Sequence, residues 1–137
     1  MNRFKNKGDA VLFSSLAAPL IMIFGDLAWY AKSRHGIDLV VTETITTDEE
    51  DRALNRESSA HNESERRAVD IRANNIDAFV VSDIVQYINN KEAYKEFHYL
   101  SNSGIRRLAY LHGEGENFHI HLALHKKYSY NLALLSE

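Results

Sequence analysis

The fold is decided by the stretch Phe118-His119-Ile120-His121-Leu122-Ala123-Leu124, in which apolar residues alternate with two histidines and an alanine. Successive side chains of an extended strand point to opposite faces of a sheet, so His119 and His121 are expected to share one face. The opposite face then carries Phe118, Ile120, Leu122 and Leu124. The pattern therefore predicts a half-buried strand that presents two imidazoles on its less buried side.

Two segments upstream add a third histidine and a carboxylate to this pair. They are Ser59-Ala60-His61 and Ala68-Val69-Asp70-Ile71-Arg72. A carboxylate such as Asp70, placed between apolar neighbours, needs a partner when it is buried, and a metal ion is one such partner. A histidine pair on a strand, with a distant histidine and a carboxylate, is typical of a zinc site with three protein ligands. Such a site keeps one position open, which indicates catalytic rather than structural zinc.

The composition is that of a small globular protein, and it argues against nucleic-acid binding and against a metal site with cysteine ligands. The chain has 137 residues, near the commonest size of a single domain, so we expect one domain over residues 1–137. Its 16 basic and 19 acidic residues give a formal net charge of −3, which argues against a nucleic-acid partner. The chain contains no cysteine, so any metal must be bound by histidine and carboxylate side chains.

An apolar segment near the N-terminus is interpreted as a core helix. Residues 11–24 follow a basic start, as in a secretory signal, but Asp9 interrupts the basic region and no small-residue cleavage site follows. From Leu16 onward the apolar positions recur at helical spacing, and Gly36 is a natural C-cap. Charged residues within this segment and its short apolar run argue against a transmembrane segment.

The remaining pattern alternates strands with helices and predicts the α+β class. The expected strands are residues 37–42, 67–72, 106–111 and 118–125, with a glycine-bearing hairpin loop at 113–117. The expected helices are residues 46–56 and 76–89, the second with Phe79, Val80, Ile84 and Ile88 on one face. The loop 57–65 and the segment 94–104 are expected to be irregular.

The order of these features resembles the zinc D-Ala-D-Ala carboxypeptidase and L-alanyl-D-glutamate endopeptidase family, especially its small phage-type members. The shared features are, in order, a helix, a strand ending in Val41-Thr42, a Thr-Asp-Glu-Glu helix start, Ser-x-His, Arg-Ala-Val-Asp-Ile-Arg, a long helix and a terminal His-x-His strand. They cover about residues 17–125. The resemblance implies the hedgehog-like peptidase fold, in which a small antiparallel sheet carries the zinc site and packs against helices.

The family motif Ser-x-His-x-x-Gly-x-Ala-x-Asp supplies the first two zinc ligands. In this chain the matching residues are Ser59, His61, Ala68 and Asp70. The resemblance implies that His61, Asp70 and His121 bind zinc, and that His119 lies beside the metal. Eight residues separate His61 from Asp70 where the family usually has six, and the motif glycine is absent, so this loop is expected to bulge.

The residues that would handle the substrate depart further from the family pattern. Relatives commonly hold a substrate carboxylate with an arginine just before the second helix, where this chain has Thr46. We expect Arg67 or Arg72 to substitute for it, with Ser59 as a further substrate-binding residue.

The general base also departs from the family pattern. The family glutamate lies three residues before the last ligand, a position that Phe118 occupies here. A base must lie within hydrogen-bond reach of the attacking water, and Glu116 is the first candidate, followed by Glu114. His119 has an alternative role, as donor of a hydrogen bond to the oxyanion.

The resemblance predicts a zinc metallopeptidase, a hydrolase that cleaves a peptide bond of bacterial peptidoglycan as a carboxypeptidase or an endopeptidase, for example in a phage endolysin. The alternative is a non-catalytic zinc-binding domain that binds a ligand or a protein partner. Cobalt or manganese would fit the same ligands. Because no convincing signal peptide is present, we expect the protein in the cytoplasm of the producing cell, from which it could be released to act on the cell wall. The remaining histidines, expected to be surface or hydrogen-bonded imidazoles, are His35, His98, His112 and His125.

Overall fold

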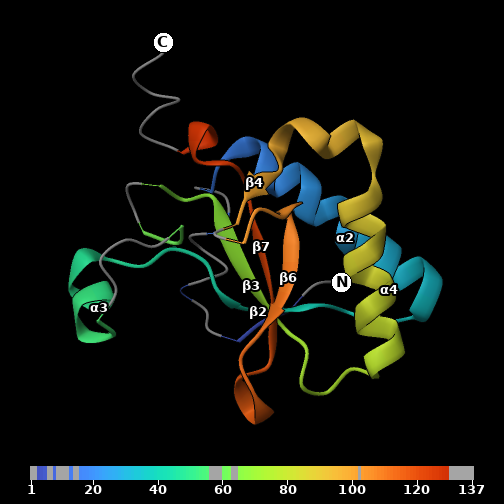
Figure 1. Ribbon diagram of the computed structural model, residues 1–137. Helices are drawn as coiled ribbons and strands as arrows, with labels where there is room; N and C mark the ends of the chain where they lie inside the picture. Colours follow the sequence, from blue (N-terminus) through green and yellow to red (C-terminus); the bar gives the residue numbers. More distant parts are fainter. Residues whose placement is uncertain are drawn as a thin grey trace.

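A five-stranded sheet forms the centre of the fold (Figure 1). The computed structural model describes residues 3–5, 8, 13, 16–55, 60–62, 65–101 and 103–129. In sheet order the strands are β1 (Arg3–Phe4), β2 (Val40–Glu43), β3 (Ala68–Arg72), β7 (His119–Ala123) and β6 (Ala109–His112). Neighbouring strands are antiparallel, except that β1 runs parallel to β2.

Two long helices pack against one face of this sheet. They are α2 (Ala18–His35) and α4 (Ala78–Asn90), which also contact each other. Their buried side chains join the inward-facing side chains of the sheet in one hydrophobic core, to which the sheet contributes Val41, Val69, Ile71, Ile120 and Leu122. Each large aliphatic side chain buried in this way contributes about 1.5–3 kcal/mol. The predicted α+β class, with a sheet packed against helices, is confirmed.

The helix α2 ends at the predicted C-cap. Pro19 lies in its first turn, where the missing N–H of proline leaves no hydrogen bond unmade. Gly36 follows the last turn with a φ of +68°, and its N–H donates to the carbonyl oxygen of Lys32. This left-handed conformation is unfavourable for other residues and favours glycine. Within the described residues, no helix combines the length and the apolar character needed to cross a membrane.

The helix α4 differs from the prediction at its buried face. Its buried residues are Val81, Ile84 and Ile88, whereas Phe79 is 87% exposed. The side chain of Asp77 caps the helix by accepting a hydrogen bond from the Phe79 N–H, so Phe79 lies in the first turn. A residue two positions before Val81 points away from the buried stripe, because helical neighbours on one face are three or four residues apart. The prediction that Phe79 shares one helix face with Ile84 and Ile88 is therefore wrong.

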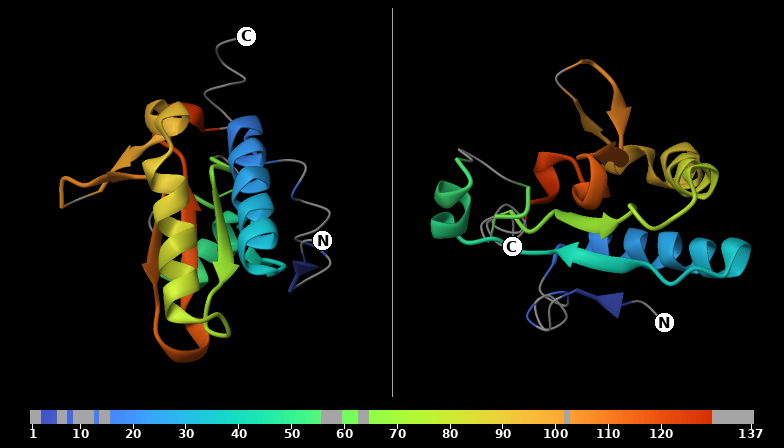
Figure 2. Two further views of the ribbon diagram at one scale, coloured as in Figure 1. Left: turned by 90° about the vertical axis from the view of Figure 1, so that its right-hand side faces the viewer. Right: turned by 90° about the horizontal axis from the view of Figure 1, so that it is seen from below.

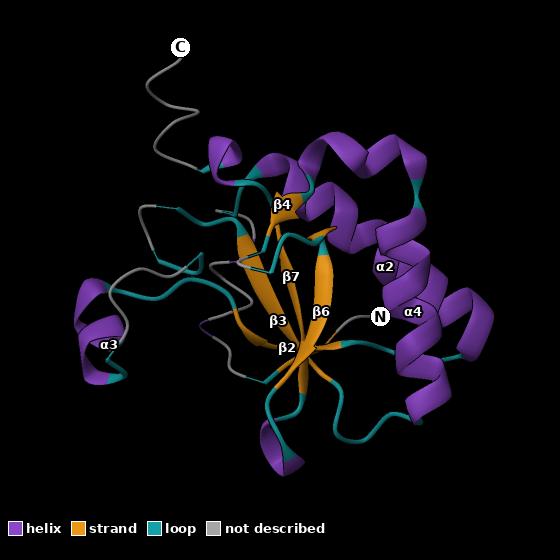
Figure 3. Ribbon diagram, viewed as in Figure 1, coloured by secondary structure: helices purple, strands orange, loops and turns teal. Residues whose placement is uncertain are grey.

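A short helix, α3 (Asp48–Ala53), lies at the opposite end of the molecule from α4 (Figure 3). Its start matches the prediction: the Thr47 hydroxyl accepts from the Glu50 N–H, and the Glu50 carboxylate accepts from the Thr47 N–H. This reciprocal capping box fixes the first turn of the helix. The helix ends at Ala53, earlier than predicted, and residues 56–59 lie outside the described part of the chain.

A small hairpin projects from the body of the molecule (Figure 2). Its strands, β4 (Tyr99–Leu100) and β5 (Arg106–Arg107), pair with each other and not with the central sheet. The predicted strand 106–111 is therefore split into β5 and β6. The segment 94–104 is more regular than predicted, because it contains the end of the 3-10 helix η1 (Glu92–Phe97) and the strand β4. The predicted β6–β7 hairpin is confirmed, and its loop holds the 3-10 turn η2 (Gly115–Asn117).

Candidate metal centre

Asp70 is the centre of the candidate site, on the sheet face that the two long helices leave uncovered. In the antiparallel pair of β3 and β7, Asp70 lies opposite His121 and Arg72 lies opposite His119. The Nδ1 atom of His121 is 2.9 Å from Oδ1 of Asp70, and Nε2 of His119 is 3.6 Å from Oδ2 of the same carboxylate. The prediction that His119 and His121 share one face is confirmed, since both imidazoles contact one carboxylate.

His61 reaches the same carboxylate from the loop that follows α3. Its Nδ1 lies 3.0 Å from the carbonyl oxygen of Thr44, so Nδ1 carries the proton and donates it to that carbonyl. The other ring nitrogen, Nε2, lies 3.1 Å from Oδ1 of Asp70 and 3.4 Å from Oε2 of Glu43. The protonated ring also donates from Nε2 to Asp70, whereas the neutral ring keeps its lone pair on Nε2, on the side of the cluster, as metal-binding histidines require. The ring is only 3% exposed.

The loop that carries His61 is fastened on both sides of the histidine. The Thr46 N–H donates to the carbonyl oxygen of His61, and the Arg67 N–H donates to that of Ala60. The side chain of Asn62 donates to the carboxylates of Asp48 and Asp51, which belong to α3. The capped helix α3 thus anchors the loop. The bulge expected in this loop includes residues 63–64, which lie outside the described residues.

The three predicted ligands form one cluster. Donor atoms of His61, Asp70 and His121 all lie within 4.8 Å of one another, and no other group of three metal-binding side chains is found among the described residues. Two imidazoles and one carboxylate suit zinc, and they also suit cobalt or manganese. The donor set therefore fits a divalent metal ion without fixing which metal it is.

Hydrogen bonding makes Asp70 a stronger acid than an ordinary aspartate. Burial acts to raise the pKa of Asp70, but the hydrogen bonds from His121 and His61 outweigh burial and hold this pKa well below its ordinary value. Burial lowers the pKa of His121, whereas at His61 the attraction of Asp70 outweighs burial and raises the pKa. In the metal-free protein Asp70 is therefore anionic, and His61 takes up a proton more readily than His121.

Aromatic rings of β6 support the two histidines of β7. Tyr110 lies opposite His121 in the sheet, with ring centroids 5.0 Å apart. His112 lies opposite His119, at 5.3 Å between centroids. The Nδ1 atom of His119 is 2.7 Å from the carbonyl oxygen of Asn117 and donates to it, so Nε2 of His119 faces the cluster. His112 therefore adjoins the histidine pair of β7.

Two cavities flank the cluster. The first, about 740 Å³, is called the His119 cavity; its lining residues include His119, Asp70, Glu116 and Arg72. The second, about 620 Å³, is called the His121 cavity; its lining residues include His121 and Arg67. The structure thus places the predicted residues Glu116 and Arg72 on one side of the cluster and Arg67 on the other.

The remaining predicted residues lie outside the cluster and its two cavities or outside the described residues. Glu114 is exposed and lines neither cavity. Ser59, the further substrate-binding candidate, lies outside the described residues. Among the remaining histidines, Nε2 of His35 is 2.7 Å from Oδ2 of Asp83, and Nδ1 of His125 accepts a hydrogen bond from the Lys127 N–H. His98 is 3% exposed and has a backbone hydrogen bond at Arg106, as expected of a hydrogen-bonded imidazole, although its Nε2 has no partner in the described part of the chain.

Sequence reasoning missed one carboxylate of the site. Glu43 lies opposite Asp70 in the pairing of β2 with β3, beside an irregularity in the strand register. Its position at the end of a strand rich in β-branched residues was a possible signal. Its approach to His61, however, depends on how the loop after α3 folds back, which no local pattern encodes.

No family model, curated protein or solved structure matches this chain. The fold and the site together define an α+β protein with a largely buried cluster of two histidines and one aspartate, a candidate site for a divalent metal ion.

Proposed function

We propose that this protein is a zinc-dependent peptidase that hydrolyses a peptide bond of bacterial peptidoglycan, as its resemblance to the carboxypeptidase and endopeptidase family implies. One observation carries the proposal: His61, Asp70 and His121 come from three separate segments and converge within 4.8 Å. These are the residues that the family motifs select as ligands. Their convergence is what a zinc site built from these motifs requires.

In this proposal, His61 Nε2, a carboxylate oxygen of Asp70 and a ring nitrogen of His121 hold the ion. A zinc ion held there would be a Lewis acid for the scissile carbonyl and would lower the pKa of a water, so that hydroxide would be available as the nucleophile near neutral pH. The side chains of this chain orient the substrate and move the protons. A peptide that crosses the cluster has room on both sides, in the His119 cavity and in the His121 cavity.

In this proposal, His119 accepts the proton of the attacking water. Because its Nδ1–H donates to the carbonyl of Asn117, the neutral ring leaves Nε2 as an acceptor that faces the carboxylate of Asp70 at 3.6 Å. After it is protonated, the same nitrogen can donate to the oxyanion or to the leaving amine. Glu116 lines the same cavity from η2 and is the second proton acceptor.

Peptide release from peptidoglycan tests the proposal. Purified protein loaded with zinc is incubated with peptidoglycan, and newly freed amino groups are identified by mass spectrometry. We expect release with zinc, none after chelation, and none with His121→Ala. The variant His125→Ala removes a histidine outside the cluster and should keep the activity. Failure of the zinc-loaded wild-type protein to release any peptide would overturn the proposal.

The second candidate function is a non-catalytic metal domain that binds a ligand or a protein partner. It is favoured by Phe118, which occupies the position of the family glutamate, and by the exposure of Glu116. Retention of zinc without release of any peptide would select this function.

A further inference from the structure

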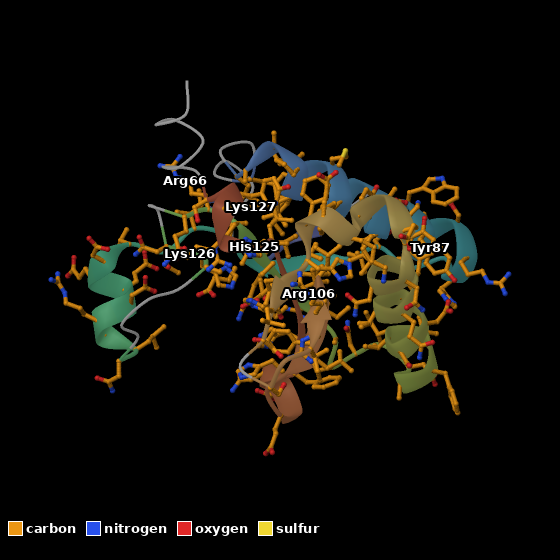
Figure 4. All side chains as sticks on the ribbon, turned by 45° about the horizontal axis from the view of Figure 1, so that its top comes forward. Arg66, Tyr87, Arg106, His125, Lys126 and Lys127 are labelled. Carbon is orange, nitrogen blue, oxygen red and sulfur yellow. The ribbon has the colours of Figure 1, made fainter. Side chains whose placement is uncertain are left out.

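Exposed apolar side chains and a group of basic side chains lie together on one surface of the molecule. The apolar side chains belong to the hairpin of β4 and β5, which projects from the body of the molecule. Leu100 and Ile105 of this hairpin are 56% and 51% exposed. Away from Tyr87 on α4, Figure 4 shows the basic side chains gathered on one side: Arg66, Arg106, His125, Lys126 and Lys127.

Backbone and ring contacts hold the hairpin beside the 3-10 turn η3 (Lys126–Tyr128). The His125 N–H donates to the carbonyl oxygen of Phe97, and the ring centroids of Phe97 and Tyr128 are 4.8 Å apart. Phe97 is the last residue of η1, and β4 begins shortly after it. The lysines of η3 are therefore held close to the base of the hairpin.

Arg66 joins these side chains from the loop that carries His61. The carbonyl oxygen of the next residue, Arg67, accepts a hydrogen bond from the Leu124 N–H, just before η3. Three segments that are distant in the sequence thus form one continuous surface. We call it the hairpin surface and define it by Arg66, Leu100, Ile105, Arg106, Lys126 and Lys127.

The hairpin presents different side chains on its two faces. Tyr99 lies opposite Arg107, and both contact the ring of Tyr110 on the central sheet. Leu100 lies opposite Arg106. Because side chains alternate along a strand, this second pair points to the face turned away from Tyr110. An apolar side chain and a guanidinium group therefore share the outer face of the hairpin.

The hairpin surface is basic in a chain whose formal net charge is −3. Residues 97–112, which contain the hairpin, and residues 117–129, which contain η3, include no acidic residue. Arg106, Lys126 and Lys127 are exposed, and no carboxylate in the described part of the chain forms an ion pair with them. Such a concentration of uncompensated cations gives this surface a positive potential, which favours an anionic partner.

The apolar side chains indicate which kind of anionic partner fits. A soluble polyanion gains little from Leu100 and Ile105, because it offers them no apolar environment. At an anionic bilayer, lysine and arginine side chains lie near the lipid phosphates while neighbouring apolar side chains enter the boundary with the acyl chains. A projecting hairpin with Leu100 beside Arg106 matches both requirements.

We propose that the hairpin surface binds the anionic surface of a lipid bilayer, with Leu100 and Ile105 at the acyl boundary and the cations at the lipid phosphates. This inference goes beyond the proposed function and depends neither on the metal cluster nor on peptidase activity. Leu100 and Ser101 also line the His121 cavity. Binding through the hairpin therefore places this cavity next to the membrane.

Vesicle sedimentation with the purified protein tests this inference. The probes are vesicles of phosphatidylcholine alone and vesicles of phosphatidylcholine and phosphatidylglycerol in equal parts. We expect binding about tenfold or more tightly to the anionic vesicles, because each lysine or arginine near such a surface contributes about fivefold. Added salt should reduce this preference by screening the charges. His121→Ala, which lacks a proposed metal ligand, should bind the vesicles as the wild-type protein does.

Exposed residues elsewhere in the fold provide matched controls. Arg106→Gln should weaken binding to anionic vesicles about fivefold, whereas Arg34→Gln removes an equal charge from α2 and should leave it unchanged. Ile105→Ser should weaken binding about tenfold, whereas Phe79→Ser removes a more exposed apolar side chain from α4 and should leave it unchanged. If Ile105→Ser does not fold, Leu100→Ser replaces it with the same expectation.

Two results would overturn the inference: no preference of the wild-type protein for anionic vesicles, or unchanged binding in both folded Arg106→Gln and the folded serine variant. Long-chain polyphosphate is measured in parallel as a soluble polyanion. Polyphosphate binding without vesicle binding would assign the surface to a soluble polyanion and would also overturn the inference.

The peptidoglycan assay separates this inference from the proposed function. Vesicle binding without peptide release would uphold the hairpin surface and count against the peptidase. Peptide release without vesicle binding would uphold the peptidase and count against the hairpin surface.

Discussion

Asp70 and His121 lie opposite each other on β3 and β7, with Oδ1 of Asp70 only 2.9 Å from Nδ1 of His121. His61 brings its Nε2 to the same oxygen, at 3.1 Å. Two imidazoles therefore converge on one buried carboxylate oxygen before any ion is bound. Such an arrangement is preorganised for a shared cation, because the carboxylate and the ring nitrogens already face one point.

Zinc should stabilise the folded protein through this cluster. A ligand that binds only the native state adds about 4 kcal/mol to the free energy of unfolding when its concentration is a thousand times its Kd. Thermal unfolding is measured with and without excess zinc. Zinc should raise the Tm of the wild-type protein and leave the Tm of His61→Ala almost unchanged. An equal rise in both proteins would contradict the role of His61.

Zinc affinity should fall as the pH is lowered. The ligand nitrogens must be unprotonated to bind metal, and the pKa of His61 is raised above its ordinary value of 6.5, mainly by Asp70 acting against burial. Protons therefore begin to compete with zinc above pH 6.5, and the affinity decreases steadily below that point. Competition titrations with a chelating dye from about pH 8 to about pH 5 measure this dependence. A constant affinity over this range would be inconsistent with imidazole ligands.

Variants of His119, Glu116 and Glu114 test which of these residues is the general base. His119→Ala should retain zinc and fold but lower kcat by a factor of about 10² or more, the usual size of a general-base contribution. Glu116→Gln should cause a smaller loss, since Glu116 is exposed on η2, and Glu114→Gln serves as the matched control with almost no loss. Steady-state kinetics on a released peptide compare the three. A larger loss in Glu116→Gln than in His119→Ala would assign the base to Glu116.

A second polar cluster should contribute to stability away from the site. The carboxylate of Asp26 on α2 accepts hydrogen bonds from Tyr87, Tyr94 and Lys91, which tie α2 to α4 and η1. Asp26→Asn should lower the free energy of unfolding by about 1–3 kcal/mol, because it removes charge-assisted hydrogen bonds from these donors. Chemical denaturation at neutral pH measures the difference.

The effect of Asp26 should also depend on pH. Burial acts to raise the pKa of Asp26, but its hydrogen bonds prevail and the pKa lies below the ordinary value of 3.8. A lowered pKa in the folded state means that the stabilisation is complete above pH 3.8 and is lost as the pH falls through the folded-state pKa. The difference between the wild-type protein and Asp26→Asn should therefore shrink in acid. A difference that stays constant down to about pH 2 would contradict this role of the carboxylate.

The parts of the fold that the sequence predicted are those with a local period or a local cap. The alternation around His119 and His121, the capping box at Thr47 and the glycine after α2 each act within a few residues, so they can be seen in one sequence. Phe79 misled the prediction because an apolar residue in a first turn resembles a member of the buried stripe.

The parts that could not be predicted depend on contacts between distant segments. The strands β4 and β5 have two residues each, too few to show alternation, and they form only when Tyr99 and Leu100 pair with Arg107 and Arg106. The same holds for Glu43, which reaches His61 through the loop after α3. The sequence suggested Arg67 or Arg72 for the substrate carboxylate; the structure shows the guanidinium of Arg67 bound to Glu65 and Leu124, and Arg72 in the His119 cavity.

The zinc content of the purified protein tests the central claim most directly. After loading with zinc and extensive dialysis, elemental analysis should find one zinc ion per chain in the wild-type protein and in His125→Ala. It should find almost none in His121→Ala, because that variant leaves only His61 and Asp70 as ligands. Undiminished zinc in His121→Ala, or no zinc in the wild-type protein, would contradict the claim that these three side chains form a metal site.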